Sequence, residues 1–216
     1  MSLLEFAKGP AIEWALIIFT AGIFFRLAVI FIFTRKKPLS VARKERKLTG
    51  FRTIFSRIVP YAVFRKRLGG AYIASATWHF GFLVILFLLP AHILFFKGLF
   101  GISWPGISHN VAMPIAGLSL ALLCWSLINR FIHPVQKKIS KLGDFLTLIV
   151  TILPLLTGLM ASAHLLVRYE TMLSIHLLSV CLFLIWFPFS KLMHVILFIP
   201  SRKRLGDKLG YKGVKA

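Results

Sequence analysis

The sequence predicts an all-α integral membrane protein built as a five-helix bundle. Of the 216 residues, 58% are hydrophobic and only 6 are Asp or Glu, and the mean hydropathy is +0.83. Such a composition is unlike that of a soluble domain around one core. A spanning helix needs about 20 apolar residues. Five segments meet that requirement within a single membrane domain over 1–216, at 12–34, 72–96, 109–129, 144–166 and 172–199.

The charge distribution predicts the orientation of these helices. The net charge is +21, and the basic residues concentrate in the 35–71 loop, in the 130–141 turn and in the 200–216 tail. Cytoplasmic loops of membrane proteins carry the excess of Lys and Arg. We therefore expect the N-terminus outside and the C-terminus in the cytoplasm. Because the cations fall between the spans, the lipid bilayer is the expected partner, and no nucleic acid is expected.

The two cysteines limit which redox cofactors this chain is expected to bind. Cys124 and Cys181 both lie inside predicted spans, and the sequence has no Cys-x-x-Cys-His motif. Covalent c-type haem and an iron–sulfur cluster are both disfavoured in this chain. Any cluster would belong to a partner.

Histidines inside the apolar segments are the candidate functional residues. His176 and His194 are eighteen residues apart in the fifth segment, which in a continuous helix puts them on one face about 27 Å apart. Pro188 lies between them and is expected to kink the helix. The second segment carries His79 and His92. A low-spin haem iron takes one neutral imidazole on each face. Four histidines on two helices therefore predict metal ligands for two stacked haems.

The predicted topology pairs these residues. The second span would run outward and the fifth inward, which sets His79 beside His194 near the cytoplasm and His92 beside His176 near the outer side. The thirteen-residue spacing from His79 to His92 rotates the second imidazole by roughly 220° in a straight helix. Pro90 lies between them, and a proline kink could turn the last part of the helix.

Several polar residues keep alternative interpretations. His109 and His164 are possible outer ligands in place of His92, although each is also typical of an interfacial residue. Arg26 in the first span either extends to the interface or pairs with a haem propionate. Gly158 is a helix-contact residue or makes room for a macrocycle. The amphipathic section 51–59 lies on the membrane surface or docks a cytoplasmic subunit.

The fifth span carries a specific motif. It reads His176-Leu177, then Leu182-Phe183, then Phe187-Pro-Phe-Ser-Lys-Leu-Met-His194, and supporting features are Trp78-His79-Phe80-Gly81, Gly143-Asp144 and Arg26. With these residues the chain resembles the gamma subunit of respiratory nitrate reductase and its wider family of membrane cytochromes b. The second-span histidines of that gamma subunit are ten residues apart, a spacing that here reaches Leu89, so a different branch of the family is predicted.

The resemblance implies the function and the partners. It implies a subunit with two haem b groups, held by His79, His92, His176 and His194, in the prokaryotic cytoplasmic (inner) membrane. It also implies electron exchange between a quinone or menaquinone pool and an iron–sulfur subunit, which a catalytic subunit accompanies on the cytoplasmic side. Lys97, His92 and Trp104 are candidates for a quinone site. No catalytic residue is expected in this chain, because electron transfer is its implied task.

Two other functions compete with this interpretation. A formate dehydrogenase type of gamma subunit is disfavoured because the first span has no histidine and because the chain has five spans. A haem-free membrane anchor or small transporter would use the same histidines structurally or for proton relay. A proton pathway favours carboxylates within the membrane, but Glu13 and Asp144 lie only at the ends of the predicted spans, which disfavours proton relay.

Overall fold

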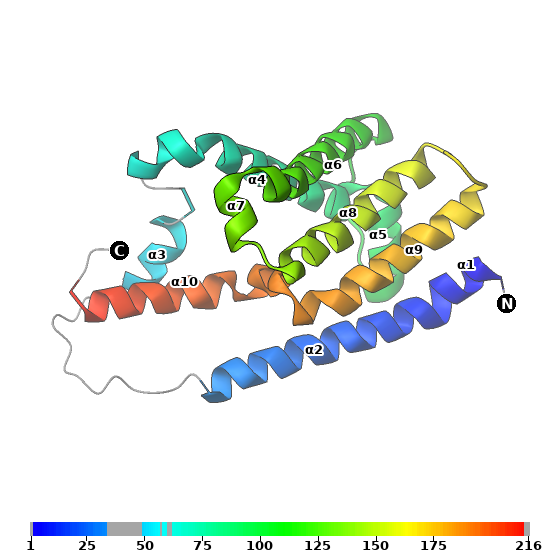
Figure 1. Cartoon of the computed structure of the whole chain (residues 1–216). Helices are drawn as coiled ribbons and strands as arrows, with labels where there is room; N and C mark the ends of the chain where they lie inside the picture. The colour runs from blue at the N-terminus through cyan, green and yellow to red at the C-terminus, as the bar shows by residue number, and fades with distance from the viewer. Residues whose placement is uncertain (1, 34–48, 57, 60–61, 214–216) are drawn as a thin grey trace. The chain divides into compact units, whose positions relative to one another are not determined.

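The computed structural model describes residues 2–33, 49–56, 58–59 and 62–213, and the regular elements in these ranges are all helical (Figure 1). Five helices are long and apolar enough to cross a membrane, which confirms the all-α membrane class. The elements are α1 (Leu3–Phe6), η1 (Ala7–Ala11), α2 (Ile12–Phe33), α3 (Thr49–Ser56), α4 (Ala62–Leu88), α5 (Pro90–Phe100), α6 (His109–Ile132), α7 (Pro134–Ile139), α8 (Leu142–Ser162), α9 (Tyr169–Trp186), η2 (Phe187–Phe189), η3 (Lys191–Met193) and α10 (His194–Tyr211).

The spanning segments differ from the predicted ones mainly at the C-terminal ends of the second and the fifth. The structure places them at Leu3–Phe33, Lys66–Leu88, His109–Ile132, Leu142–Ser162 and Tyr169–Phe189. The second predicted segment continued to residue 96, but α4 stops at Leu88. The fifth continued to residue 199, but α9 stops at Trp186. Proline follows each stop closely, at Pro90 and Pro188, and proline supplies no N–H to the helix ladder.

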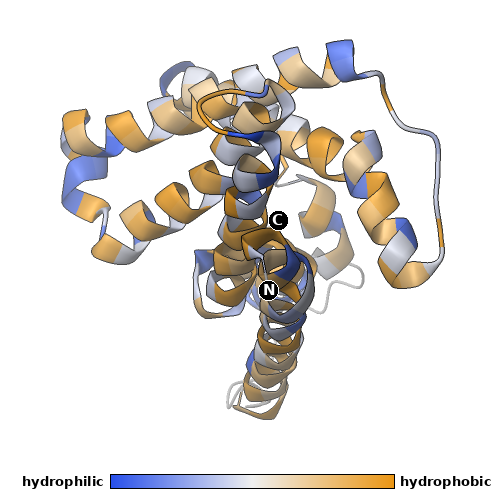
Figure 2. Cartoon of the chain, turned by 90° about the vertical axis from the view of Figure 1, so that its right-hand side faces the viewer, coloured by the Kyte–Doolittle hydropathy of each residue, from blue (hydrophilic) through white to orange (hydrophobic). Residues whose placement is uncertain are grey.

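The helices consist of apolar residues over most of their length, as the hydropathy colouring shows (Figure 2). Phe24 on α2 is 68% exposed and Phe80 on α4 is 71% exposed. Only between 6% and 33% of each spanning window is buried inside the protein. Extended apolar surface of this kind matches a hydrocarbon environment. The chain is a multi-pass membrane protein.

The chain forms two compact units, of which the first comprises Met1–Phe19 and Ala71–Trp186. Within this unit α8 packs against α6 and α9. Small residues recur every three or four positions on α6, at Ala112, Ala116 and Ser119, and allow close approach of neighbouring helices. Ile85 of α4 joins Ala112 and Ala116 in one buried cluster, which Leu159 of α8 borders.

Local signals explain how the first helix of this unit begins. At the start of the chain, Ser2 accepts a hydrogen bond from the Glu5 N–H, and the Glu5 carboxylate accepts one from the Ser2 N–H. This capping box satisfies backbone donors that the first turn leaves open. A wide π-type turn over Ala7–Ala11 contains Pro10, and the helix continues beyond it.

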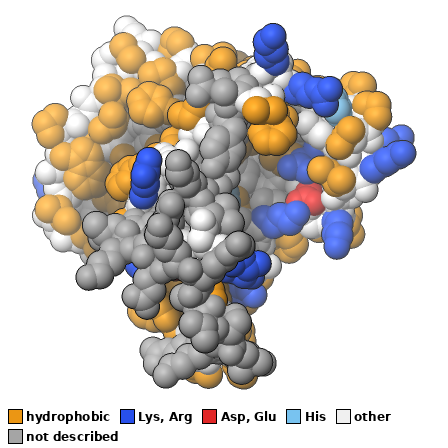
Figure 3. All heavy atoms as spheres, turned by 90° about the vertical axis from the view of Figure 1, so that its left-hand side faces the viewer, with side chains coloured by type: hydrophobic (Ala, Val, Ile, Leu, Met, Phe, Trp, Pro, Cys, Tyr) orange, Lys and Arg blue, Asp and Glu red, His pale blue; other side chains and the backbone are white. Residues whose placement is uncertain are grey.

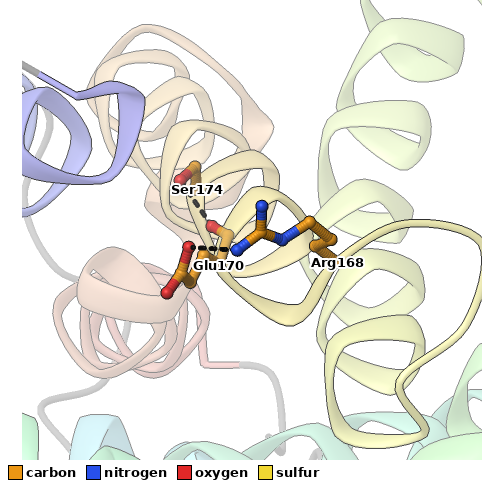
Figure 4. Close-up of polar contacts among 3 residues, drawn as sticks. All are labelled: Arg168, Glu170 and Ser174. Atoms are coloured by element: carbon orange, nitrogen blue, oxygen red, sulfur yellow. Dashed lines mark hydrogen bonds and ion pairs between the residues drawn. The ribbon is translucent and has the colours of Figure 1, made fainter.

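The turn between α8 and α9 brings the last two spans of this unit together. His164 and Leu166 adopt positive φ values of 53° and 68° in this turn. Figure 4 shows the start of α9, where the Arg168 guanidinium lies 3.7 Å from the Glu170 carboxylate and the Ser174 hydroxyl donates to the Glu170 carbonyl. The ion pair is largely exposed, so its contribution to stability is small.

The second unit comprises Thr20–Gly70 and Phe187–Ala216, and its main helix contact joins α3 to α10. Gly50 and Thr53 lie buried on one face of α3, and Gly206 and Gly210 lie buried on α10. Small residues four apart let two helix backbones approach closely. The amphipathic section predicted to lie on the membrane or on a subunit therefore packs, over α3, against the C-terminal helix of its own chain.

Basic side chains cover much of the remaining surface of α10. Lys203 lies 2.9 Å from the Asp207 carboxylate and 5.4 Å from the Phe51 ring of α3, so it links the two helices of the second unit. Figure 3 shows a face on which Lys and Arg side chains lie among hydrophobic ones. Residues 34–48 lie outside the described residues. They include the first part of the basic loop predicted over 35–71.

We expect Gly50→Ala to lower the thermal unfolding midpoint of the purified protein in detergent. A Cβ at this position would overlap the Asp207 side chain and lie 2.8 Å from the Lys203 carbonyl oxygen. Overpacking of this kind typically costs about 1–3 kcal/mol. Gly69→Ala is the matched control, because a Cβ there meets nothing within 4 Å and alanine favours a helix. Equal midpoints for the two variants would contradict the packing described here.

Candidate functional site

A complete helix break separates His79 from His92. Helix α4 ends at Leu88, Leu89 is extended with φ −72° and ψ 127°, and α5 begins at Pro90. Proline lacks the N–H that would continue the ladder, and it biases the preceding residue away from helical ψ. The kink predicted at Pro90 is therefore a break, which redirects His92 from the rotation that a straight helix would impose.

Side chains and a loop donate to carbonyl groups at the end of α4. The Trp104 Nε1–H donates to the Phe87 carbonyl at 2.6 Å. The His92 Nδ1–H donates to the Ile85 carbonyl at 2.8 Å, and that carbonyl also keeps its helical bond from the Leu89 N–H at 3.3 Å. The backbone N–H of Ile107 donates to the Leu88 carbonyl at 2.9 Å. Backbone groups at membrane depth need such partners because lipid offers none. Trp104, a quinone-site candidate from the sequence, donates here to a main-chain carbonyl at the helix break.

The break brings the His92 ring opposite the His176 ring of α9. Their ring centroids are 6.3 Å apart, and the ring planes are inclined by 16°. Two metal–nitrogen bonds of about 2 Å each, plus roughly 1 Å from each nitrogen to its ring centre, span about 6 Å. The observed separation therefore matches two imidazoles on opposite sides of one metal ion. This is the pairing that the sequence predicted for the outer side.

Helix α8 holds the His176 ring from the side. The Thr157 hydroxyl oxygen lies 3.2 Å from His176 Nδ1. One residue further along, a Cβ at Gly158 would lie 3.1 Å from His176 Cε1, so the ring rests against bare backbone. The sequence left Gly158 open between a helix contact and room for a macrocycle. In the structure this glycine makes room for a candidate ligand.

The other two candidate histidines each hydrogen-bond a main-chain carbonyl through Nδ1, as His92 does. His79 Nδ1 lies 2.7 Å from the Ser75 carbonyl oxygen, and His194 Nδ1 lies 2.8 Å from the Lys191 carbonyl oxygen. A carbonyl only accepts, so each Nδ1 carries the proton and each Nε2 carries the lone pair. Metal-binding histidines characteristically donate their second ring N–H in this way. Each of the two is thus prepared to coordinate through Nε2.

His194 lies outside the helix that carries His176. The 3₁₀ turns η2 and η3 follow α9, the Ser190 hydroxyl caps the second turn at the Leu192 N–H, and His194 opens α10. Pro188 causes this interruption and fits against α2, where a Cβ at Gly22 would lie 2.6 Å from the proline ring. The segment predicted over 172–199 is therefore two helices joined by 3₁₀ turns. The interruption is more complete than the kink expected at Pro188, and His176 and His194 share no continuous helical face.

The structure does not bring every candidate residue together. His79 belongs to the first unit and His194 to the second, so their pairing stays a prediction. Arg26 is exposed on α2, and Lys97 is exposed in the last turn of α5. Of the alternative outer ligands, His109 opens α6 and His164 packs on the Tyr169 ring at 5.1 Å.

The donor set at His92 and His176 restricts the ions that it could hold. Among the described residues no group of three or more His, Cys, Asp and Glu side chains could bind a metal ion. Two imidazoles alone leave most coordination positions of a metal unfilled. A porphyrin fills the remaining four positions around iron, so a haem is the metal group that fits two histidines.

Sequence comparison finds a relative that aligns with nearly the whole chain. The protein is 27% identical over 206 residues to a protein from Nitratidesulfovibrio vulgaris, an alignment that covers 93% of this chain and 91% of that protein. The name of that relative describes no activity. No protein-family model and no solved structure matches the chain.

Sequence reasoning missed the residues that support the ligands. Thr157, Ser179 and Ser75 contact histidines or their neighbours, but hydroxyl residues in apolar helices ordinarily bond their own helix. Thr157 is nineteen residues from His176 in the chain. Only the packing of α8 on α9 places the two side chains together.

We expect Trp104→Phe to destabilise the protein. Phenylalanine keeps an aromatic ring near Phe96 but removes the N–H that satisfies the Phe87 carbonyl. Lipid offers no replacement donor, and an unsatisfied carbonyl costs about 1–3 kcal/mol. The thermal midpoint in detergent should fall for this variant. It should stay unchanged for Trp14→Phe, because Trp14 is 65% exposed. An unchanged midpoint for Trp104→Phe would show that the carbonyl finds another donor.

Proposed function

We propose that this protein is a membrane-anchoring di-haem cytochrome b subunit of a respiratory oxidoreductase complex. The observation that carries the proposal is the His92 and His176 pair, with ring centroids 6.3 Å apart across two helices and a hydrogen bond at each Nδ1. Each haem supplies one-electron chemistry when bound. The protein supplies the axial ligands, their orientation and an apolar surround.

The residues near the first site fit a haem chemically. Both imidazoles are half-buried, and both present Nε2 as the coordinating nitrogen. Gly158 gives the His176 ring room against α8, so that ring keeps its place without displacing the helix. Such support fixes ligand orientation and raises ligand basicity.

The second haem is proposed at His79 and His194. The support is the Nδ1 hydrogen bond that each makes to a main-chain carbonyl, together with the fifth-span motif that ends at His194. Arg26 is the proposed cationic partner for a propionate at this level. Its position on the membrane-spanning α2, seven residues before the helix ends, suits a carboxylate near the membrane edge.

The partners and location follow from the charge pattern and from the resemblance. The basic turn and tail support a cytoplasmic C-terminus under the positive-inside rule. We therefore place the protein in the prokaryotic inner membrane, where it would transfer electrons between quinone or menaquinone and a cytoplasmic iron–sulfur subunit. The catalytic subunit would be a further partner in the same complex.

A reduced-minus-oxidised absorption spectrum with a pyridine haemochrome count tests the proposal. The parent protein should contain two b haems. His92→Ala and His176→Ala should each lose one haem, and the double variant should lose no more than either single variant, because both ligands serve one iron.

His109→Ala and His164→Ala are the matched controls and should keep both haems. A colourless parent prepared with haem supplied would overturn the proposal and favour a haem-free anchor or transporter. Loss of different haems in the two single variants would overturn the His92 and His176 pairing.

Gly158→Val should weaken haem retention at the His92 and His176 site. The added side chain would occupy the space of the His176 ring, whose nearest atom lies 3.1 Å from an added Cβ. Gly117→Val on α6 is the matched control, since a Cβ there meets nothing within 4 Å. The haem-to-protein ratio after purification should fall toward one in the first variant and stay at two in the second. Equal ratios would contradict the close fit of His176 on α8.

A further inference from the structure

Thr157 lies buried between α8 and α9, where its hydroxyl contacts four polar atoms. The side chain is 7% exposed. Its Oγ1 lies 2.7 Å from the Leu153 carbonyl oxygen, 3.4 Å from the Pro154 carbonyl oxygen, 3.0 Å from Ser179 Oγ and 3.2 Å from His176 Nδ1. The hydroxyl is therefore the centre of a small polar network at membrane depth.

Counting protons assigns the direction of these hydrogen bonds. A hydroxyl has one proton to donate, whereas a carbonyl can only accept. The shortest contact of Thr157 is to the Leu153 carbonyl, so the threonine proton goes there. The Ser179 hydroxyl donates its own proton to the His176 carbonyl at 2.7 Å, so its 3.0 Å contact with Thr157 is not a donation to that oxygen. The oxygen lone pairs then accept from His176 Nδ1–H. This leaves the His176 lone pair on Nε2, on the side that a metal requires.

We propose that Thr157 is a positioning residue for His176, and that its hydroxyl sets the reduction potential of the haem at the His92 and His176 site. The inference rests on the proposed function and adds a residue that tunes it. Donation of Nδ1–H to an acceptor makes Nε2 a stronger ligand, which stabilises oxidised iron and lowers the potential.

The Thr157 hydroxyl lies 3.2 Å from His176 Nδ1, and this ring also interacts with the Pro154 carbonyl. His79, His92 and His194 each have a main-chain carbonyl within 2.8 Å of Nδ1. A main-chain acceptor persists through any substitution, but a hydroxyl is set by residue identity. Thr157 is therefore a position at which a single side chain tunes one haem without changing its ligands.

The ordinary role of a buried threonine in an apolar helix is a bond to its own helix. Thr151, on the same helix and 4% exposed, shows that role, because its hydroxyl donates to the Thr147 carbonyl at 2.7 Å. Thr157 makes the equivalent bond and in addition reaches α9. Thr151 is therefore the matched control.

A potentiometric titration of the full-length protein, followed at the b-haem absorption bands, tests the proposal. The His92→Ala variant first identifies which midpoint belongs to this site. In Thr157→Val that midpoint should shift to a more positive potential, while the midpoint of the other haem stays unchanged. Thr157→Ser, which restores a hydroxyl, should return the midpoint toward the parent value, and Thr151→Val should change neither midpoint.

Each other outcome is decisive. Two haems with unchanged midpoints in Thr157→Val would overturn the positioning role while leaving the proposed function intact. Loss of the outer haem in Thr157→Val supports the role if Thr157→Ser recovers it and overturns the role if it does not. A parent without haem would instead overturn the proposed function on which this inference rests.

Discussion

The need to satisfy backbone hydrogen bonds inside an apolar environment organises the candidate site. Lipid supplies no donors, so a helix break at membrane depth persists only where protein groups replace the lost bonds. At Pro90 the replacements are the Trp104 indole and the Ile107 N–H. The His92 ring donates to the Ile85 carbonyl at the same end of α4, which orients the ring. The helix break therefore also determines where this candidate ligand lies.

The ligands are held from outside the helices that carry them. His176 belongs to α9, but a hydroxyl and a bare glycine on α8 decide where its ring lies and which nitrogen is protonated. His92 belongs to α5, but its acceptor is a carbonyl of α4. Neither imidazole can rotate without losing a hydrogen bond, so the proposed haem site would keep its ligand geometry when the iron changes charge.

Much of the fold and part of the site could be predicted from local pattern. Apolar runs of about 20 residues identify spanning helices without reference to any contact. Pro90 indicated a redirected helix, and its position between His79 and His92 made the His92 pairing conceivable. The kink expected at Pro188 is a full interruption in the structure, because Pro188 and Ser190 together end one helix and start another. Thr157 left no sequence signal, since a threonine beside its own helix carbonyl looks the same with or without a histidine neighbour.

Sequence alone determined the membrane class, the five spans and the residue types available to a metal, because composition, segment length and side-chain chemistry are local properties. The tertiary structure decided which two imidazoles face each other, which nitrogen each presents and which neighbours hold them. These depend on the packing of α8 on α9 and on the direction that α5 takes after the break. Residues such as Thr157 and His176 meet only through folding, so no spacing along the chain records their contact.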